Sequence, residues 1–148
     1  MISKKTQYSI YALVRLGKEF EKGPLLISEI ATTEKIPKKF LEAILLELKS
    51  GGFVNSKKGK GGGYYLIKNP KDINLADIIR LFEGAIALLP CAAYKYYESC
   101  SSCRDEETCG VRNVVKEVRE ETVRLLKTFS IADIISREEN LLKNISKS

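Results

Sequence analysis

Apolar residues recur at helical spacing along the first fifty positions. Residues 5–20 place their apolar side chains on one stripe of a predicted helix, and a short second helix follows with Ser28 as its expected cap. A third helix begins at Pro37, because the first residue of a helix tolerates a missing N–H, and it stops at Gly51, with apolar residues again three and four positions apart. A short helix, a tight turn and a second helix are typical of a helix-turn-helix.

The period of the pattern changes after the third helix. Residues 53–56 and 64–67 have the character of two short strands, joined by a basic, glycine-rich loop over 57–63. A hairpin of this kind beside a helix-turn-helix is a wing. The glycines are followed by a strand-like run, whereas a phosphate-cradling loop opens a helix, so we expect no nucleotide cofactor.

A long amphipathic helix dominates the second half. Asn74 and Asp77 resemble a capping box that opens a fourth helix, an irregular segment covers 84–109, and the long helix then starts at Gly110. At about 20 residues, or roughly 30 Å, it is too long for so small a domain to cover alone. Its apolar seam consists of Val111, Val114, Val115, Val118, Leu125, Leu126 and Phe129. We expect a partner subunit to cover the seam; folding back over the chain's own core is the alternative.

The predicted fold is therefore mainly α with a small β-hairpin wing: a winged helix-turn-helix with a long C-terminal dimerisation helix. We expect a DNA-binding domain over 1–83 and a cysteine-rich loop over 84–109. The dimerisation helix and one following turn occupy 110–135, and a frayed tail occupies 136–148.

Charge divides the 148 residues into two unlike halves. The net charge is +6, but residues 1–80 hold 15 Lys/Arg against 8 Asp/Glu, a net +7, and residues 81–148 hold 10 against 11, a net −1. A basic half is typical of a nucleic-acid surface, with a merely solubilising, lysine-rich surface as the alternative.

Composition also narrows the chemistry and the location. The chain has no histidine, which excludes Ser-His-Asp and Cys-His catalytic pairs, so we expect no enzyme. The longest apolar run, 85–89, is far short of the roughly 20 residues that span a membrane. Because the N-terminus also lacks the pattern of a secretory signal, we expect a cytoplasmic protein with no membrane contact.

The candidate DNA contacts lie at the start of the third helix and in the hairpin loop. Lys38 and Lys39 are placed to touch the DNA backbone or guanine. Glu42 is suited to accept a hydrogen bond from cytosine N4, although a solvated surface glutamate is the alternative. In the loop, lysines can reach the sugar-phosphate backbone and glycines permit close approach. These loop residues are Lys57, Lys58, Lys60, Gly61 and Gly62.

Four cysteines, Cys91, Cys100, Cys103 and Cys109, are the candidate metal ligands. Structural disulfides are disfavoured in the cytoplasm, so clustered thiols indicate metal binding or redox work. Zinc usually takes paired C-x2-C motifs, and only one such pair is present, which favours an iron-sulfur cluster over zinc. A thiol-disulfide switch and ordinary buried cysteines remain as alternatives. Neighbouring cations are expected to help the thiols deprotonate. These are Lys95, Arg104 and Arg112.

Taken together, these motifs resemble the Rrf-type winged helix-turn-helix transcriptional regulators. The resemblance runs from Ser3 to about Ile135 and is most specific in the stretches 36–45, 58–64 and 131–134 and in the C-x5-C pair. It implies a homodimer joined through the long helix and bound to a palindromic operator on double-stranded DNA. In the iron-sulfur-binding subgroup it also implies a 2Fe-2S or 4Fe-4S cluster that controls the DNA affinity of a repressor.

The resemblance assigns roles to particular residues. It implies base reading by Glu42, minor-groove entry by Lys58, where an arginine is often found, and cluster ligation by Cys103 and Cys109. A histidine ligand of some members falls at Arg112, which cannot ligate. An aspartate that other members borrow from the partner subunit falls at Tyr8. Neither borrowed ligand is available, so Cys91 and Cys100 are expected to complete an all-cysteine set.

The expected function is thus a sequence-specific regulator whose operator affinity is controlled by a cysteine-ligated cluster. A cluster-free or zinc-binding regulator of the same fold is one alternative. A small redox or cluster-carrier protein without any DNA function is the alternative from another class.

Overall fold

Three N-terminal helices pack around a core of aliphatic side chains. The computed structural model describes residues 2–147, so Met1 and Ser148, the outermost residues of the expected segments, lie outside it. The helices are α1 (Lys4–Lys18), α2 (Ile27–Glu34) and α3 (Lys38–Ser50). Core side chains that solvent does not reach include Leu13 and Leu16 of α1, Ile30 of α2, and Leu41, Ile44, Leu45 and Leu48 of α3. The apolar stripes of all three helices thus meet in one core.

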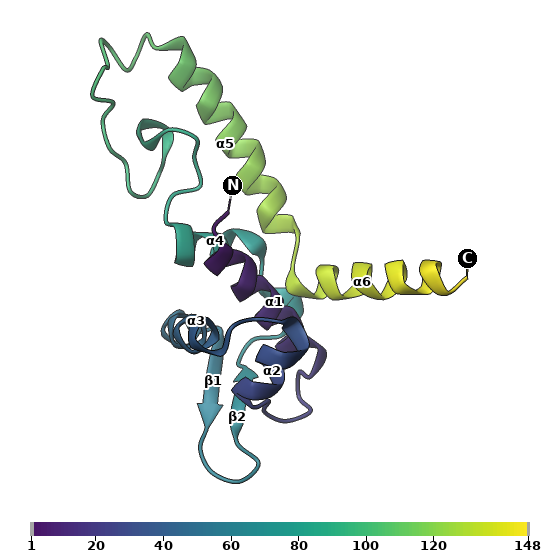
Figure 1. The fold of residues 1–148 in the computed structure, drawn as a ribbon. Coiled ribbons are helices and arrows are strands. Elements are labelled where there is room, and N and C mark those ends of the chain that lie inside the picture. The colour runs from purple at the N-terminus through teal and green to yellow at the C-terminus, as the bar shows by residue number, and fades with distance from the viewer. Residues whose placement is uncertain (1, 148) are drawn as a thin grey trace.

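The wing is an antiparallel hairpin of β1 (Val54–Lys57) and β2 (Gly63–Leu66). Leu25, just before α2, adds a bridge on the other side of β2: its N–H donates to the carbonyl of Tyr64 at 2.8 Å, and the N–H of Tyr64 donates back at 2.7 Å. The chain entering α2 therefore pairs with the wing, which fixes the wing relative to the helix-turn-helix (Figure 1).

A 3-10 turn, η1 (Pro70–Asp72), leads from the wing to α4 (Leu75–Glu83). As the sequence predicts, Asn74 caps α4, because its side-chain oxygen accepts from the N–H of Asp77 at 3.0 Å. At the other end of α4, the Glu83 carboxylate accepts from the N–H of Ser3, at 2.6 Å, and from the hydroxyl of Thr6. These bonds hold α4 against the start of α1.

The long helix α5 (Gly110–Thr128) projects away from this body, beside the irregular segment that contains the 3-10 turn η2 (Pro90–Ala92) (Figure 1). It contacts α4 and η2. Among its residues only Arg119 is buried, whereas four residues of the predicted apolar seam are exposed. These are Val111 (65%), Val114 (59%), Val118 (43%) and Leu125 (46%). The helix therefore does not fold back over the core along this seam.

Backbone pairing joins the base of α5 to the start of α4. The N–H of Leu75 donates to the carbonyl of Phe129 at 3.0 Å, and the N–H of Ile131 donates to the carbonyl of Ile73 at 2.9 Å. Ile131 is fully buried in the same core as the N-terminal helices. The lower end of the long helix is thus fixed to the body that carries the helix-turn-helix.

The last helix is longer than the sequence interpretation expects. In place of one turn and a frayed tail over 136–148, the structure has α6 (Ile131–Ser146), which extends away from the body in Figure 1. Ser130 caps it in a two-way capping box with Asp133. Leu141 and Leu142 continue the apolar spacing of its first turns, but they are exposed, so this part of the helix is not stabilised by packing on the core.

A smaller correction concerns α2. Ser28 is not its cap: the cap residue is Leu26, two residues earlier, and its N–H donates to the Glu29 carboxylate at 3.0 Å. Within residues 2–147, no helix combines the length and the apolar character that crossing a membrane requires. The mainly helical fold with a two-stranded wing and a long C-terminal helix is confirmed.

Candidate DNA-binding surface and cysteine pocket

A groove of about 450 Å³ lies between the start of α3 and the wing. Four of the predicted DNA contacts line it: Lys38, Glu42, Lys57 and Lys58. The structure therefore brings together residues that the sequence places on two different elements. Lys39 and Lys60 are exposed and do not line the groove.

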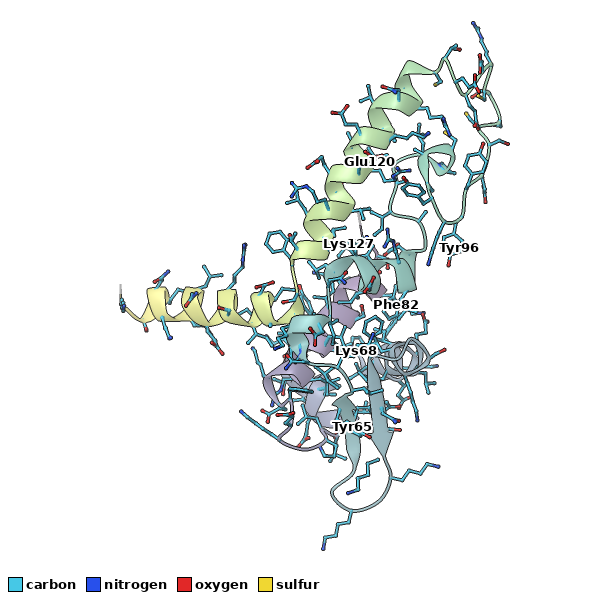
Figure 2. All side chains as sticks on the ribbon, turned by 180° about the vertical axis from the view of Figure 1, so that it is seen from behind. Tyr65, Lys68, Phe82, Tyr96, Glu120 and Lys127 are labelled. Atoms are coloured by element: carbon cyan, nitrogen blue, oxygen red, sulfur yellow. The ribbon has the colours of Figure 1, made fainter. Side chains whose placement is uncertain are left out.

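The lysines of this surface are available to a polyanion. Lys38, Lys39, Lys57, Lys58 and Lys60 are all exposed, and none has an ion-pair partner among residues 2–147. Figure 2 shows long side chains with terminal nitrogen atoms projecting from the hairpin loop, away from the body. Unpaired, exposed cations lose little when they exchange water for phosphate.

The two predicted glycines of the loop have different surroundings. Gly61 is exposed and has a φ of +75°, a backbone conformation that glycine adopts readily. Gly62 is buried, its N–H donates to the carbonyl of Gly59 at 3.0 Å, and a Cβ there would overlap the carbonyl of Lys57. Gly62 therefore shapes the loop from inside.

Sequence reasoning missed the contribution of α2. Ile27 and Ser28, at its first turn, line the same groove as Lys38 and Lys58. The first N–H groups of a helix have no partner within the helix and suit a phosphate oxygen. The bridge between Leu25 and Tyr64 brings this turn beside the wing, and no local signal in the sequence predicts that pairing.

All four cysteines line a single pocket of about 410 Å³. Cys91 lies in η2 and is buried, Cys109 is the cap residue of α5 and is half-buried, and Cys100 and Cys103 are exposed. The pair is held in a turn, since the N–H of Cys103 donates to the carbonyl of Cys100 at 3.1 Å. All four thiols are free.

The electrostatics of the exposed pair differ from the sequence expectation. The pKa of Cys100 is lowered by its hydrogen bond with the Ser102 hydroxyl, and the pKa of Cys103 is raised, first by desolvation and then by the charge of Glu106. Of the three expected cations, Arg104 and Arg112 line the pocket, but Lys95 lies in a neighbouring cavity. None of the three contributes to these two shifts.

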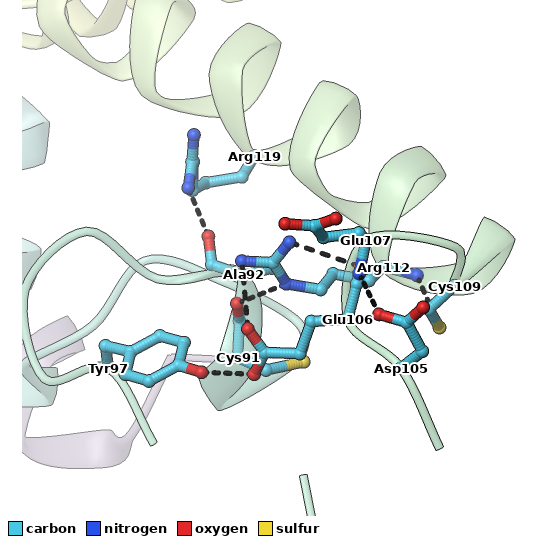
Figure 3. A network of polar contacts seen from close by, with 9 residues as sticks. All are labelled: Cys91, Ala92, Tyr97, Asp105, Glu106, Glu107, Cys109, Arg112 and Arg119. Atoms are coloured by element: carbon cyan, nitrogen blue, oxygen red, sulfur yellow. Dashed lines mark hydrogen bonds and ion pairs between the residues drawn. The ribbon is translucent and has the colours of Figure 1, made fainter. Parts of the chain in front are cut away.

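The start of α5 forms one wall of the pocket (Figure 3). The Cys109 sulfur accepts from the N–H of Arg112 at 3.4 Å, which is the usual interaction of a helix cap. The Arg112 side chain donates through Nε to the carbonyl of Cys91 at 3.0 Å. Arg112, which cannot ligate a metal, thus supports one wall of the pocket through its hydrogen bonds.

The pocket has the right donors for a thiophilic metal centre, but they are not yet gathered around one point. Four thiols and no imidazole suit an iron-sulfur cluster or zinc. Among residues 2–147, no three Cys, Asp or Glu side chains are close enough together to hold an ion. The donor set fits such a group, and the thiols would have to come closer together to complete the site.

Comparisons with known proteins address the regulator interpretation. Residues 2–137 match the family model Rrf2, described as an iron-dependent transcriptional regulator. An rrf2-like HTH-type transcriptional regulator of Rhodobacter capsulatus is 38% identical over 92% of this chain and 93% of its own length. The HTH-type transcriptional regulator CymR of Bacillus subtilis is 32% identical over 82% of this chain and 84% of its own.

Solved structures agree with these matches. The structure of CymR, the global cysteine regulator of B. subtilis, superposes with a TM-score of 0.76 at 27% identity, covering 93% of this chain and 97% of that one. IscR of T. potens gives a TM-score of 0.75 at 26% identity, covering 95% and 90%. These relatives are transcriptional regulators and not enzymes, which confirms the expectation of a non-enzyme and favours a regulator over a carrier without DNA function.

Proposed function

Because the chain belongs to the Rrf2 family and is a DNA-binding transcriptional regulator, we propose that it is a homodimer whose affinity for a palindromic operator is controlled by a cysteine-ligated iron-sulfur cluster. The observation that carries the proposal is the pocket lined by all four cysteines, one wall of which is the start of the projecting helix. The description of the family as iron-dependent supports iron as the metal.

DNA reading is assigned to the groove between α3 and the wing. The start of α3 enters the major groove, where Lys38 and Lys39 contact phosphate or guanine and Glu42 accepts from a cytosine amino group. Lys57, Lys58 and Lys60 grip the backbone, with Lys58 directed to the minor groove. The Glu42 carboxylate is repelled by the DNA phosphates, so it costs binding energy unless it accepts a hydrogen bond from a base.

Dimerisation is assigned to the exposed stripe of α5, which comprises Val111, Val114, Val118 and Leu125. These residues are spaced three, four and seven positions apart, so they lie along one side of the helix. Burying them against the same stripe of a second chain removes apolar surface from water and relates two reading heads by a two-fold axis. A two-fold dimer matches a palindromic operator.

The cysteine pocket is assigned to the cluster. Cys91, Cys100, Cys103 and Cys109 would hold it through their thiolates, in a 2Fe-2S or 4Fe-4S form. When bound, a cluster supplies a centre that responds to iron supply, oxygen or other oxidants. The chain's own residues connect the site to α5: the half-buried Cys109 caps the start of the helix, and the carbonyl of the buried Cys91 accepts a hydrogen bond from Arg112.

Changes in the cysteine pocket are transmitted to the DNA-binding body along α5. Its upper end is joined to the pocket at Cys109, and its lower end is paired with the first residues of α4 through Phe129. The helix spans about 28 Å between these ends. A change in the pocket can therefore shift α5 and with it the spacing of the two reading heads, which is a shift between two populations of the dimer.

The test is anaerobic purification followed by measurement of iron, sulfide and zinc per chain and of the visible absorption spectrum. The expected result is iron and sulfide in equal amounts, a coloured protein, and loss of both in the Cys103→Ser variant. DNA binding is then compared between loaded and metal-free protein on the same operator. A difference in affinity that disappears in Cys103→Ser supports the proposal.

Three results would overturn it. Colourless protein with stoichiometric zinc identifies a zinc-binding regulator, and protein without metal identifies a cluster-free one. Equal affinities of loaded and metal-free protein would leave a regulator whose cysteines serve its structure.

A further inference from the structure

Two arginines on one face of α5 hold the turn that carries Cys91. Arg112 and Arg119 are seven residues apart, close to two helical turns, so they lie above one another (Figure 3). Arg112 donates through Nε to the carbonyl of Cys91 at 3.0 Å, and Arg119 donates to the carbonyl of Ala92. Two consecutive carbonyls of η2 are therefore tied to α5.

Arg112 has further partners that Arg119 lacks. Its guanidinium lies 3.6 Å from the Glu106 carboxylate, which also accepts from the Tyr97 hydroxyl. Its backbone N–H donates to the sulfur of Cys109 at 3.4 Å. A single residue thus touches the segments of Cys91, Glu106 and Cys109, which are separate along the chain.

The surroundings of Arg112 make these bonds stronger than surface ones. Its side chain is 19% exposed, and that of Glu106 is 31% exposed. Hydrogen bonds from a charged donor that is partly shielded from water are shorter and stronger than neutral ones. By contrast, Cys100 and Cys103 are exposed and are held by their own turn and by Ser102. The pocket has one fixed half and one loosely held half.

We propose that Arg112 is a positioning residue whose side chain fixes Cys91 against the start of α5, which Cys109 caps, as the rigid half of the pocket, toward which the Cys100–Cys103 turn moves when a metal centre binds. The metal-dependent movement rests on the proposed function, whereas the fixing of Cys91 does not. The guanidinium of Arg112 can do this because it donates from several nitrogens at once, to the Cys91 carbonyl and toward the Glu106 carboxylate, and a lysine ammonium cannot reproduce that geometry.

The primary test measures the alkylation rate of each thiol by mass spectrometry in the metal-free, full-length protein. In the wild type, Cys91 should react much more slowly than Cys100 and Cys103. In Arg112→Met, the rate at Cys91 should rise by about tenfold or more because local opening exposes it, while the rates at Cys100 and Cys103 stay unchanged.

Arg124→Met is the matched control. Arg124 lies on the same helix and pairs with Glu121 at 2.9 Å, but its side chain is 60% exposed and it touches no part of the pocket. This variant should label like the wild type. A wild-type rate at Cys91 in Arg112→Met would overturn the proposal.

A second variant covers the case in which Arg112→Met labels all four thiols and loses helix content. Arg112→Lys keeps the charge but lacks the Nε donor, so Cys91 should still react faster than in the wild type while the circular dichroism stays the same. Wild-type labelling of Cys91 in the folded lysine variant would also overturn the proposal.

Anaerobic reconstitution with iron and sulfide separates the two proposals. If the wild type takes up no iron, the cluster function fails, and the alkylation rates alone decide the role of Arg112 in fixing Cys91. If the wild type loads, protection of Cys100 and Cys103 on loading supports the movement of their turn, and unchanged labelling of both contradicts it. Faster release of iron to a chelator from Arg112→Lys than from Arg124→Met would support the positioning role in the loaded protein.

Discussion

The N–H of Leu75 donates to the carbonyl of Phe129 at 3.0 Å, which joins the first residue of α4 to the cap residue that follows α5. Together with the Ile131–Ile73 bond, this pairing fixes the long helix at its lower end. The apolar stripe of α5 is left exposed above that point. A second chain that packs on the stripe would therefore be held in a defined orientation to the DNA-binding body.

Charge placed in the α5 stripe should separate the dimer. We expect the double variant Val114→Asp, Val118→Asp to sediment as a monomer, because two carboxylates would have to be buried without partners. Asn113→Asp, on the opposite side of the same helix, should remain dimeric. Sedimentation velocity measures both, and a dimeric double variant at the wild-type concentration would contradict the assignment.

Neutralising Lys58 should weaken binding to every DNA sequence by a similar factor. In Lys58→Gln, the slope of log affinity against log salt concentration should fall by about 1, because one phosphate contact is lost. Lys127→Gln, which removes an exposed lysine of α5, should leave that slope unchanged. Fluorescence anisotropy over a salt series gives the slopes, and equal slopes in the two variants would count against a phosphate contact.

Glu42 should act on sequence preference more than on overall affinity. We expect Glu42→Gln to lose about 1–3 kcal/mol of discrimination at one base pair of each half-site, with other positions unaffected. Glu139→Gln, at an exposed site on α6, is the control. Binding to a set of operators with single base changes tests this, and an unchanged preference at every position would mean that Glu42 is only solvated.

A side chain at Gly63 should damage the wing. Its φ is +140° and a Cβ would overlap the carbonyl of Leu25, so Gly63→Ala should lower the free energy of unfolding by about 2 kcal/mol or more. Gly110→Ala, where the added Cβ meets open space at the start of α5, should be neutral or slightly stabilising. Thermal unfolding compares the two, and a wild-type melting temperature for Gly63→Ala would refute the close packing.

The Glu83 carboxylate should make stability depend on pH. Hydrogen bonds from the hydroxyl of Thr6 and the N–H of Ser3 lower the pKa of Glu83 below its ordinary value of 4.5. Its stabilising contribution is therefore complete above that value and is lost as the pH falls through the folded-state pKa. Glu83→Gln should melt below the wild type at about pH 7 and approach it at about pH 3. A constant difference between the two melting curves would exclude this linkage.

Local signals account for most of the DNA-binding body. The Asn74 cap, the glycines that bound the hairpin and the apolar spacing of α3 each act within a few residues, so the sequence predicts them. The distal half of α6 was not predictable in this way. Leu141 and Leu142 continue the helical spacing of apolar residues but are exposed, whereas most helices in proteins are stabilised by packing of an apolar face. Ser28 has the residue type of a cap, but the helix begins before it, and the Glu29 carboxylate accepts from the N–H of the actual cap residue, Leu26.

The cysteine pocket was predictable in composition but not in construction. Four clustered thiols identify the donors, whereas the bonds that support them link Arg112 to Cys91 and Arg119 to Ala92, across 21 and 27 residues. The segment over 84–109 has no period that fixes its path. Distance along the chain therefore does not predict which charges lie near the thiols. Lys95 is only four residues from Cys91 but lines another cavity, and the charge that acts on Cys103 is that of Glu106.

Cys109 directly precedes Gly110, the first residue of α5, so pocket and helix share a boundary with no intervening residue. One residue inserted there would turn every later side chain by about 100° around the helix axis. Because the lower end of α5 is fixed to the body, Cys109 would turn away from Arg112 and Cys91, and the two sides of the pocket would separate. The exit of the cysteine segment therefore has a fixed length, which is set by the rotation of α5 about its axis.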